Sequence, residues 1–102
     1  MIKVKIGGIE RDYDKANESW ISQQINRRRE DGIAVCVTVI VNDGDLNFIL
    51  STPTCGNTGG GRRPLRSDEK IILELWNQRG LNKPDFTGGN LIAFLKQLKK
   101  ML

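Results

Sequence analysis

The chain begins with an alternation of apolar and charged residues that is typical of a half-buried β-strand. Residues 2–6 read Ile-Lys-Val-Lys-Ile, the pair Gly7-Gly8 follows, and the period of two resumes over residues 9–13. Paired glycines accept the positive φ angles of a type I′ turn, so the pattern predicts a β-hairpin. Its register sets three pairs opposite each other: Ile6 with Ile9, Val4 with Arg11 and Ile2 with Tyr13.

Over residues 15–31 the apolar spacing changes to that of a helix. Trp20, Ile21 and Ile25 form a narrow apolar stripe, and Gly32 supplies a C-terminal stop. Because the stripe is thin, we expect this helix to lie on the sheet with most of its circumference in water. Its arginine run, followed at once by two acids, is predicted to form a solvated face: Arg27, Arg28 and Arg29.

A second hairpin is predicted over residues 33–52. Residues 33–41 are β-branched at almost every position and apolar on both faces, which is typical of a central strand. A turn signal follows, and residues 46–52 return as the partner strand. With Asp43-Gly44 as the two turn residues, the register sets Val41 opposite Leu46, Val39 opposite Phe48 and Val37 opposite Leu50.

Two more helices are predicted in the second half of the chain. Ser67, Asp68 and Glu69 form a good helix start, because a short hydroxyl caps free amides and acids suit the positive end of the helix dipole. Gly80 ends this helix. The final helix has the clearest amphipathic spacing in the sequence, with apolar residues at Leu91, Phe94, Leu95, Leu98 and Leu102.

The predicted order is therefore β-β-α-β-β-α-α. Separate hairpins and helices favour an α+β fold with an antiparallel sheet of about four strands and three helices packed mainly on one face. With 102 residues, we expect a single domain over residues 1–102, interrupted by a long Gly/Arg-rich loop at residues 53–66.

Composition narrows the class of protein. Hydrophobic residues make up 38% of the chain, but no apolar run approaches the roughly 20 residues that cross a bilayer. The first residues lack the apolar block of a signal peptide, so the sequence predicts a cytoplasmic protein without membrane association. The net charge of +4 is compatible with an anionic partner, and its distribution along the chain matters more than its size.

The glycine–arginine segment, residues 53–66, is the part of the chain that packing does not explain. It carries three arginines and no acid. Backbone amides, a following helix N-terminus and guanidinium groups all favour phosphate or carboxylate. A disordered connector that its arginines keep soluble is the alternative, and the sequence leaves both open. The candidate binding residues are Gly59, Gly60, Gly61, Arg62, Arg63 and Arg66.

The segment partly resembles two phosphate-binding motifs and departs from both. Gly56 and Gly61 have the spacing of a P-loop, but Arg62 and Arg63 replace the lysine and the metal-binding hydroxyl. Six residues separate Cys55 from Arg62, where the loop of the cysteine phosphatases has five. Cys55 is therefore a weak candidate for a catalytic nucleophile, and the sequence favours a binding protein over an enzyme.

The two cysteines are too few for a four-ligand zinc site, and the chain contains no histidine. We therefore expect neither a metal site nor a cofactor. The predicted register sets Cys36 opposite Ser51, which leaves Cys55 four residues further along, about 13 Å away. Bridged Cα atoms lie within about 7 Å of each other. A disulfide is thus disfavoured unless the chain curls back after Pro53.

These observations favour a small non-enzymatic domain that engages an acidic partner, either an acidic protein or nucleic-acid phosphates, through residues 59–66. The lysines of the last helix, Lys96, Lys99 and Lys100, would assist. An inhibitor or immunity-type interaction module that offers the edge of the first hairpin is the alternative. A cysteine-dependent phosphate enzyme is the third hypothesis. The sequence does not indicate an oligomeric state.

Overall fold

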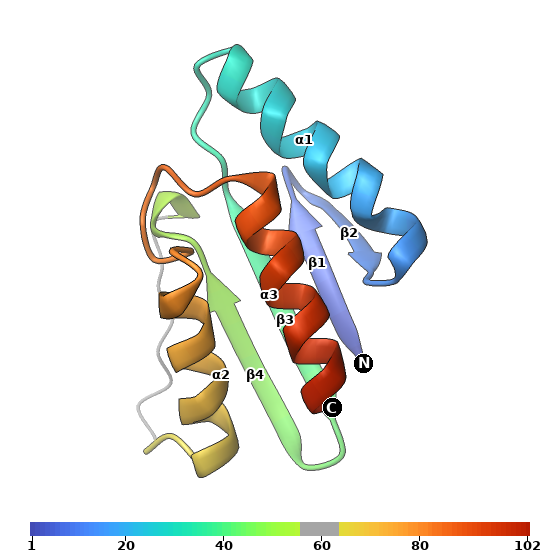
Figure 1. Ribbon diagram of the computed structural model, residues 1–102, viewed down its shortest axis with the longest axis vertical. Helices are drawn as coiled ribbons and strands as arrows, with labels where there is room; N and C mark the ends of the chain where they lie inside the picture. The colour runs from blue at the N-terminus through green and yellow to red at the C-terminus, as the bar shows by residue number, and fades with distance from the viewer. Residues whose placement is uncertain (56–63) are drawn as a thin grey trace.

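The computed structural model describes residues 1–55 and 64–102 (Figure 1). A four-stranded antiparallel sheet with the order β2-β1-β3-β4 is covered on one face by three helices, which confirms the predicted α+β architecture and element order. The strands are β1 (Ile2–Ile6), β2 (Ile9–Asp12), β3 (Val37–Asp43) and β4 (Leu46–Ser51). The helices are α1 (Glu18–Glu30), α2 (Ser67–Gln78) and α3 (Gly88–Met101), and short 3-10 turns cover Lys15–Asn17 (η1) and Pro53–Cys55 (η2).

The first hairpin has the predicted register. Ile6 pairs with Ile9 and Val4 pairs with Arg11. The amide of Tyr13 donates to the carbonyl of Ile2 at 2.8 Å, which extends the ladder to the third predicted pair. Gly7 and Gly8 have φ angles of 57° and 86°, so the turn uses the left-handed conformations for which the glycine pair is suited.

The second hairpin has the predicted strands but not the predicted register. Asp43 pairs with Leu46, so Gly44 and Asp45 form the turn and every partner is displaced by two residues. Because the displacement is even, the same side chains still face the core. The observed pairs include Val41 with Phe48 and Val39 with Leu50.

The strand predicted to begin at Ile33 begins instead at Val37. Neighbouring strands explain the difference: the β1 ladder ends where Ile6 pairs with Val37, and the β4 ladder ends where Thr38 pairs with Ser51. Residues 33–36 therefore have no described strand beside them, and Ile33 is exposed. The predicted central position of the strand is confirmed, since β3 lies between β1 and β4.

One core lies between the sheet and the helices. Alternate residues of β1 and β3 are buried, and the buried isoleucines Ile21 and Ile25 of α1 join them. The rings of Trp76 on α2 and Phe94 on α3 meet edge to face, with centroids 5.2 Å apart and planes at 86°. The opposite face of the sheet carries no described helix (Figure 1).

The expected solvated arginine face of α1 is wrong for two of its three members. Arg28 is half-buried, and its guanidinium donates to the backbone and side-chain oxygens of Gln24 at 3.1 and 2.8 Å. Arg29 is also half-buried and stacks over Phe86, 5.4 Å from the ring centroid. Both side chains are long enough to lie along the packed surface, which the charge pattern alone does not show.

Among the described residues, no helix combines the length and the apolar character that crossing a bilayer requires.

Candidate functional site

A disulfide joins Cys36 to Cys55, with their Cα atoms 4.8 Å apart, so the prediction against this bridge is wrong. Two features remove the expected separation. The displaced register brings residue 53, rather than Ser51, opposite Cys36, which halves the offset. The turn η2 then folds the chain back after Pro53, which is the exception that the sequence left open.

Threonine hydroxyls hold this turn against the start of β3. The side chain of Thr52 is fully buried, and its hydroxyl accepts from the amide of Val37 at 3.1 Å and lies 3.3 Å from the carbonyl oxygen of Val35. The Thr54 hydroxyl donates to the same carbonyl. Cys55 is therefore fixed beside β3 by polar contacts as well as by the disulfide.

The far end of the glycine–arginine segment meets the domain at a different place. Arg66 is the N-cap residue of α2, and its guanidinium donates to the carbonyl oxygen of Asp45 at 2.9 Å. The helix starts at Ser67 as predicted, but Ser67 is its first helical residue and not its cap. The Arg66 side chain makes no cap hydrogen bond to the first turn of α2.

The two ends of the segment are thus held at opposite ends of the second hairpin. Cys55 lies beside Val37 at the start of β3, whereas Arg66 lies beside Asp45 in the β3–β4 turn. The seven residues of β3 separate these points by about 20 Å. A P-loop and a phosphatase loop both need the end of a strand next to the N-terminus of the following helix. The described ends of this segment do not have that arrangement.

Of the six predicted binding residues, only Arg66 falls within the described residues, and it is exposed. Gly59, Gly60, Gly61, Arg62 and Arg63 lie outside them. Cys55, the weak candidate for a nucleophile, has its sulfur bonded to Cys36 and carries no thiol in this form.

The lysines predicted to assist lie on the last two turns of α3. This helix ends, and α2 begins, at the end of the sheet that carries the β3–β4 turn (Figure 1). Lys96 lies 3.9 Å from Glu18, and the ammonium of Lys99 lies above the ring of Tyr13, 6.0 Å from its centroid. Lys100 is exposed. These cations therefore share one end of the molecule with Arg66.

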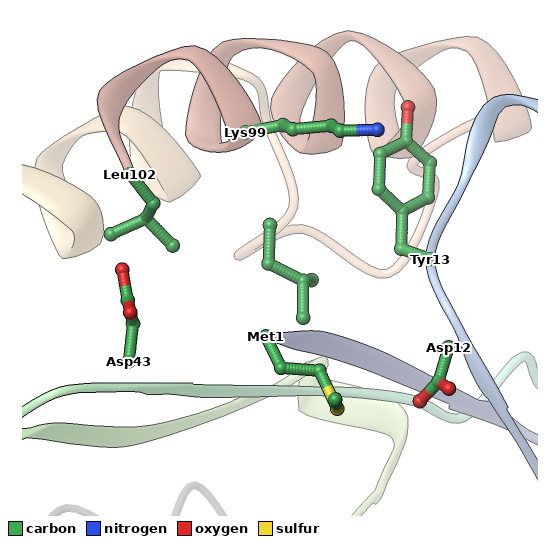
Figure 2. A pocket seen from close by; sticks show the side chains of 7 residues that line it. Met1, Asp12, Tyr13, Asp43, Lys99 and Leu102 are labelled. Carbon is green, nitrogen blue, oxygen red and sulfur yellow. The ribbon is translucent and has the colours of Figure 1, made fainter.

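An open pocket of about 420 Å³, which was not predicted from the sequence, lies at the same end (Figure 2). Figure 2 shows Asp43 and Asp12 on opposite sides of Met1, with Lys99 and Tyr13 across from them. No motif marks such a pocket, because its lining comes from separate parts of the chain: Met1, Ile2, Asp12, Tyr13, Asp43, Lys99 and Leu102.

The Tyr13 hydroxyl at this pocket donates to a carboxylate oxygen of Glu18 at 2.9 Å. Burial, together with this hydrogen bond and the negative charges of Glu18 and Asp14, raises the pKa of Tyr13 well above its ordinary value. The phenol therefore stays protonated at neutral pH and serves as a hydrogen-bond donor, and it is no base.

Within residues 1–55 and 64–102, no three side chains of the metal-binding types converge on one point. Comparison of the chain with protein-family models, with curated proteins and with solved structures found no match.

Proposed function

We propose that this protein is a small non-enzymatic binding domain that engages an acidic partner, nucleic acid or protein, through residues 59–66. The observation that carries the proposal is the position of Arg66. Its exposed side chain stands at the N-terminus of α2 and makes no cap hydrogen bond to that helix. Amides and the positive end of a helix dipole attract anions.

Charge distribution supports the same surface. Arg62 and Arg63 are two of the 16 basic residues that outnumber the 12 acidic ones, and they lie in the acid-free segment that ends at Arg66. The lysines in the last turns of α3 stand at the same end of the molecule (Figure 1). An anionic polymer that lies along the segment would therefore meet further cations beyond it.

The test is a binding titration with a fluorescent single-stranded oligonucleotide and, separately, with a polyglutamate peptide. Affinity should fall steeply between about 50 and 200 mM salt, because binding releases counterions. The triple variant R62A/R63A/R66A should lower the slope of log K against log salt by about 2, at about 0.7 per lost phosphate contact. The matched control K5A/R79A/K83A removes three exposed cations elsewhere and should leave the slope almost unchanged. An equal decrease of the salt slope in both variants would show that binding depends only on the net charge of the protein and would contradict the proposed site. An affinity that does not change with salt would contradict the proposal as a whole.

The alternative is an interaction module that offers the edge of the first hairpin. The structure places β2 at this edge with all four residues exposed. Glu10 and Asp12 sit on it, however, and edge charges oppose strand pairing. One stoichiometric protein partner in a pull-down, lost on substitution in β2, would favour this function.

The third hypothesis, a cysteine-dependent phosphate enzyme, requires Cys55 as a free thiolate. Phosphatase activity that appears only after reduction, and that Cys55→Ser abolishes, would support it. The bridge also bears on the predicted cytoplasmic location, because disulfides persist mainly in oxidising compartments. Trapping of free thiols in the native source, followed by mass spectrometry, decides whether the pair is oxidised there.

A further inference from the structure

The strand β4 has a partner on one side only among the described residues (Figure 1). In an antiparallel ladder, alternate residues direct both main-chain groups to the same side. The amide of Thr52 donates to the carbonyl of Val37, so Phe48 and Leu50, which are even numbers of residues away, also face β3. The main-chain groups of the residues between them therefore point away from the sheet: Asn47, Ile49 and Ser51.

These outward groups form no hydrogen bond with any described residue. The strand is six residues long, and its own sequence lacks two features that often protect an edge, charge and proline. An extended strand placed beside it would find three residues whose amides and carbonyls have no partner within residues 1–55 and 64–102.

The other edge of the sheet differs. The amide of Tyr13 donates to Ile2, so the outward main-chain groups of β2 belong to Glu10 and Asp12. Two copies joined through β2 would set these carboxylates opposite each other, which is destabilising. Charge therefore opposes self-association at β2 and permits it at β4.

We propose that two copies of this chain pair antiparallel through β4, with the two-fold axis at Ile49. Each Ile49 then faces the Ile49 of the second copy, and Asn47 faces Ser51 on either side. About six main-chain hydrogen bonds form, two for each facing pair. The result is one continuous eight-stranded sheet.

Side chains on the open face support this register. Ile49 is 54% exposed, and within one copy it pairs with the half-buried Ile40. Pairing across the axis extends these two residues into a row of four isoleucines. Cross-strand apolar pairs of this kind stabilise a sheet. The polar pairs that flank the row carry no charge, so no like charges meet along β4.

The experiment is sedimentation velocity or light scattering over a concentration series up to about 1 mM, with the disulfide intact. The wild-type chain should dimerise with rising concentration. The I49K variant should raise the concentration of half-association by at least about tenfold, because two like charges would face each other. I49E should behave in the same way, and an equimolar mixture of the two variants should restore the dimer. The matched control is I71K, which changes an isoleucine of similar exposure on α2 and should dimerise like the wild type.

Three results would overturn the proposal: a wild-type chain that stays monomeric throughout, an I49K variant that still dimerises, or an equal loss in I71K. Amide hydrogen exchange gives a second readout that does not depend on any variant. The amides of Asn47, Ile49 and Ser51 should gain protection only as concentration rises. Protection that is already complete in the dilute monomer would show that the chain covers this edge itself, and it would also overturn the proposal.

Discussion

The backbone amide of Val37 donates its hydrogen bond to the side-chain hydroxyl of Thr52, 3.1 Å away. The hydroxyl stands in place of a main-chain carbonyl at the point where the β3–β4 ladder ends. Thr52→Val keeps the shape of this fully buried side chain but leaves the amide without its acceptor. We expect the free energy of unfolding to fall by about 1–3 kcal/mol in urea denaturation. Thr52→Ser keeps the hydroxyl and should lose only about 1 kcal/mol. Wild-type stability in Thr52→Val would show that this bond contributes nothing.

The disulfide should stabilise the fold without being required for it. The bridge joins residues 19 positions apart in the sequence, and cross-links of this span are worth about 3 kcal/mol. The double variant C36A/C55A should therefore unfold at lower urea concentration, while the threonine contacts of η2 keep its circular dichroism native. The oxidised wild type should show no titratable thiol in the native state. Two reactive thiols in that sample would contradict the bridge.

Tyr13 should be hard to ionise. Its pKa is raised in the folded protein, so the folded state holds the phenolic proton at pH values where the unfolded chain releases it. The stabilisation is complete below the ordinary pKa of about 10 and is lost as the pH rises through the folded value. The chain contains one tyrosine, so tyrosinate absorbance reports on this group alone. We expect the tyrosinate absorbance of the folded protein to rise at higher pH than that of a denatured control. The Tyr13→Phe variant should lack the part of the stability loss at alkaline pH that comes from ionisation of this phenol. Normal titration of the folded protein near pH 10 would contradict the expectation.

The two glycines of the first turn should differ in their tolerance of a side chain. Both have positive φ, so alanine costs about 1–2 kcal/mol at either position. At Gly7 the new Cβ would also meet the guanidinium of Arg28, whereas at Gly8 the space is open. Gly7→Ala should therefore be the more destabilising change in thermal unfolding. In an Arg28→Ala background the difference between the two positions should vanish, and its persistence would exclude the contact as the cause.

Much of the fold follows from periodicity. A period of two assigned the buried residues of β1, β3 and β4, whereas β2 buries none, and a period of 3.6 identified the three helices. The alternation of buried and exposed positions cannot distinguish Asp43-Gly44 from Gly44-Asp45 as the turn residues. A register shift of two residues leaves the same side chains facing the core. That small ambiguity doubled the expected offset between Cys36 and Cys55 and led to the wrong prediction about the bridge.

The candidate site was less predictable. Composition singled out the glycine–arginine segment, but no pattern indicated that one end is bonded to Cys36 and that the other donates to the carbonyl of Asp45. Each end depends on contacts between residues far apart in the chain. The stacking of Arg29 on Phe86 is also a contact between residues far apart in the chain. The charge pattern of α1 therefore led to the wrong prediction that Arg29 belongs to a solvated face.

All three helices lie on one face of the sheet, so strand residues that face the helices should tolerate substitution less well than strand residues on the opposite face. Along β3, Val37, Val39 and Val41 are enclosed, whereas the half-buried Thr38 and Ile40 belong to the face that carries no described helix. In a saturation library, tolerance to substitution should therefore alternate residue by residue. A departure from that alternation at an exposed position would mark a contact made outside the folded monomer.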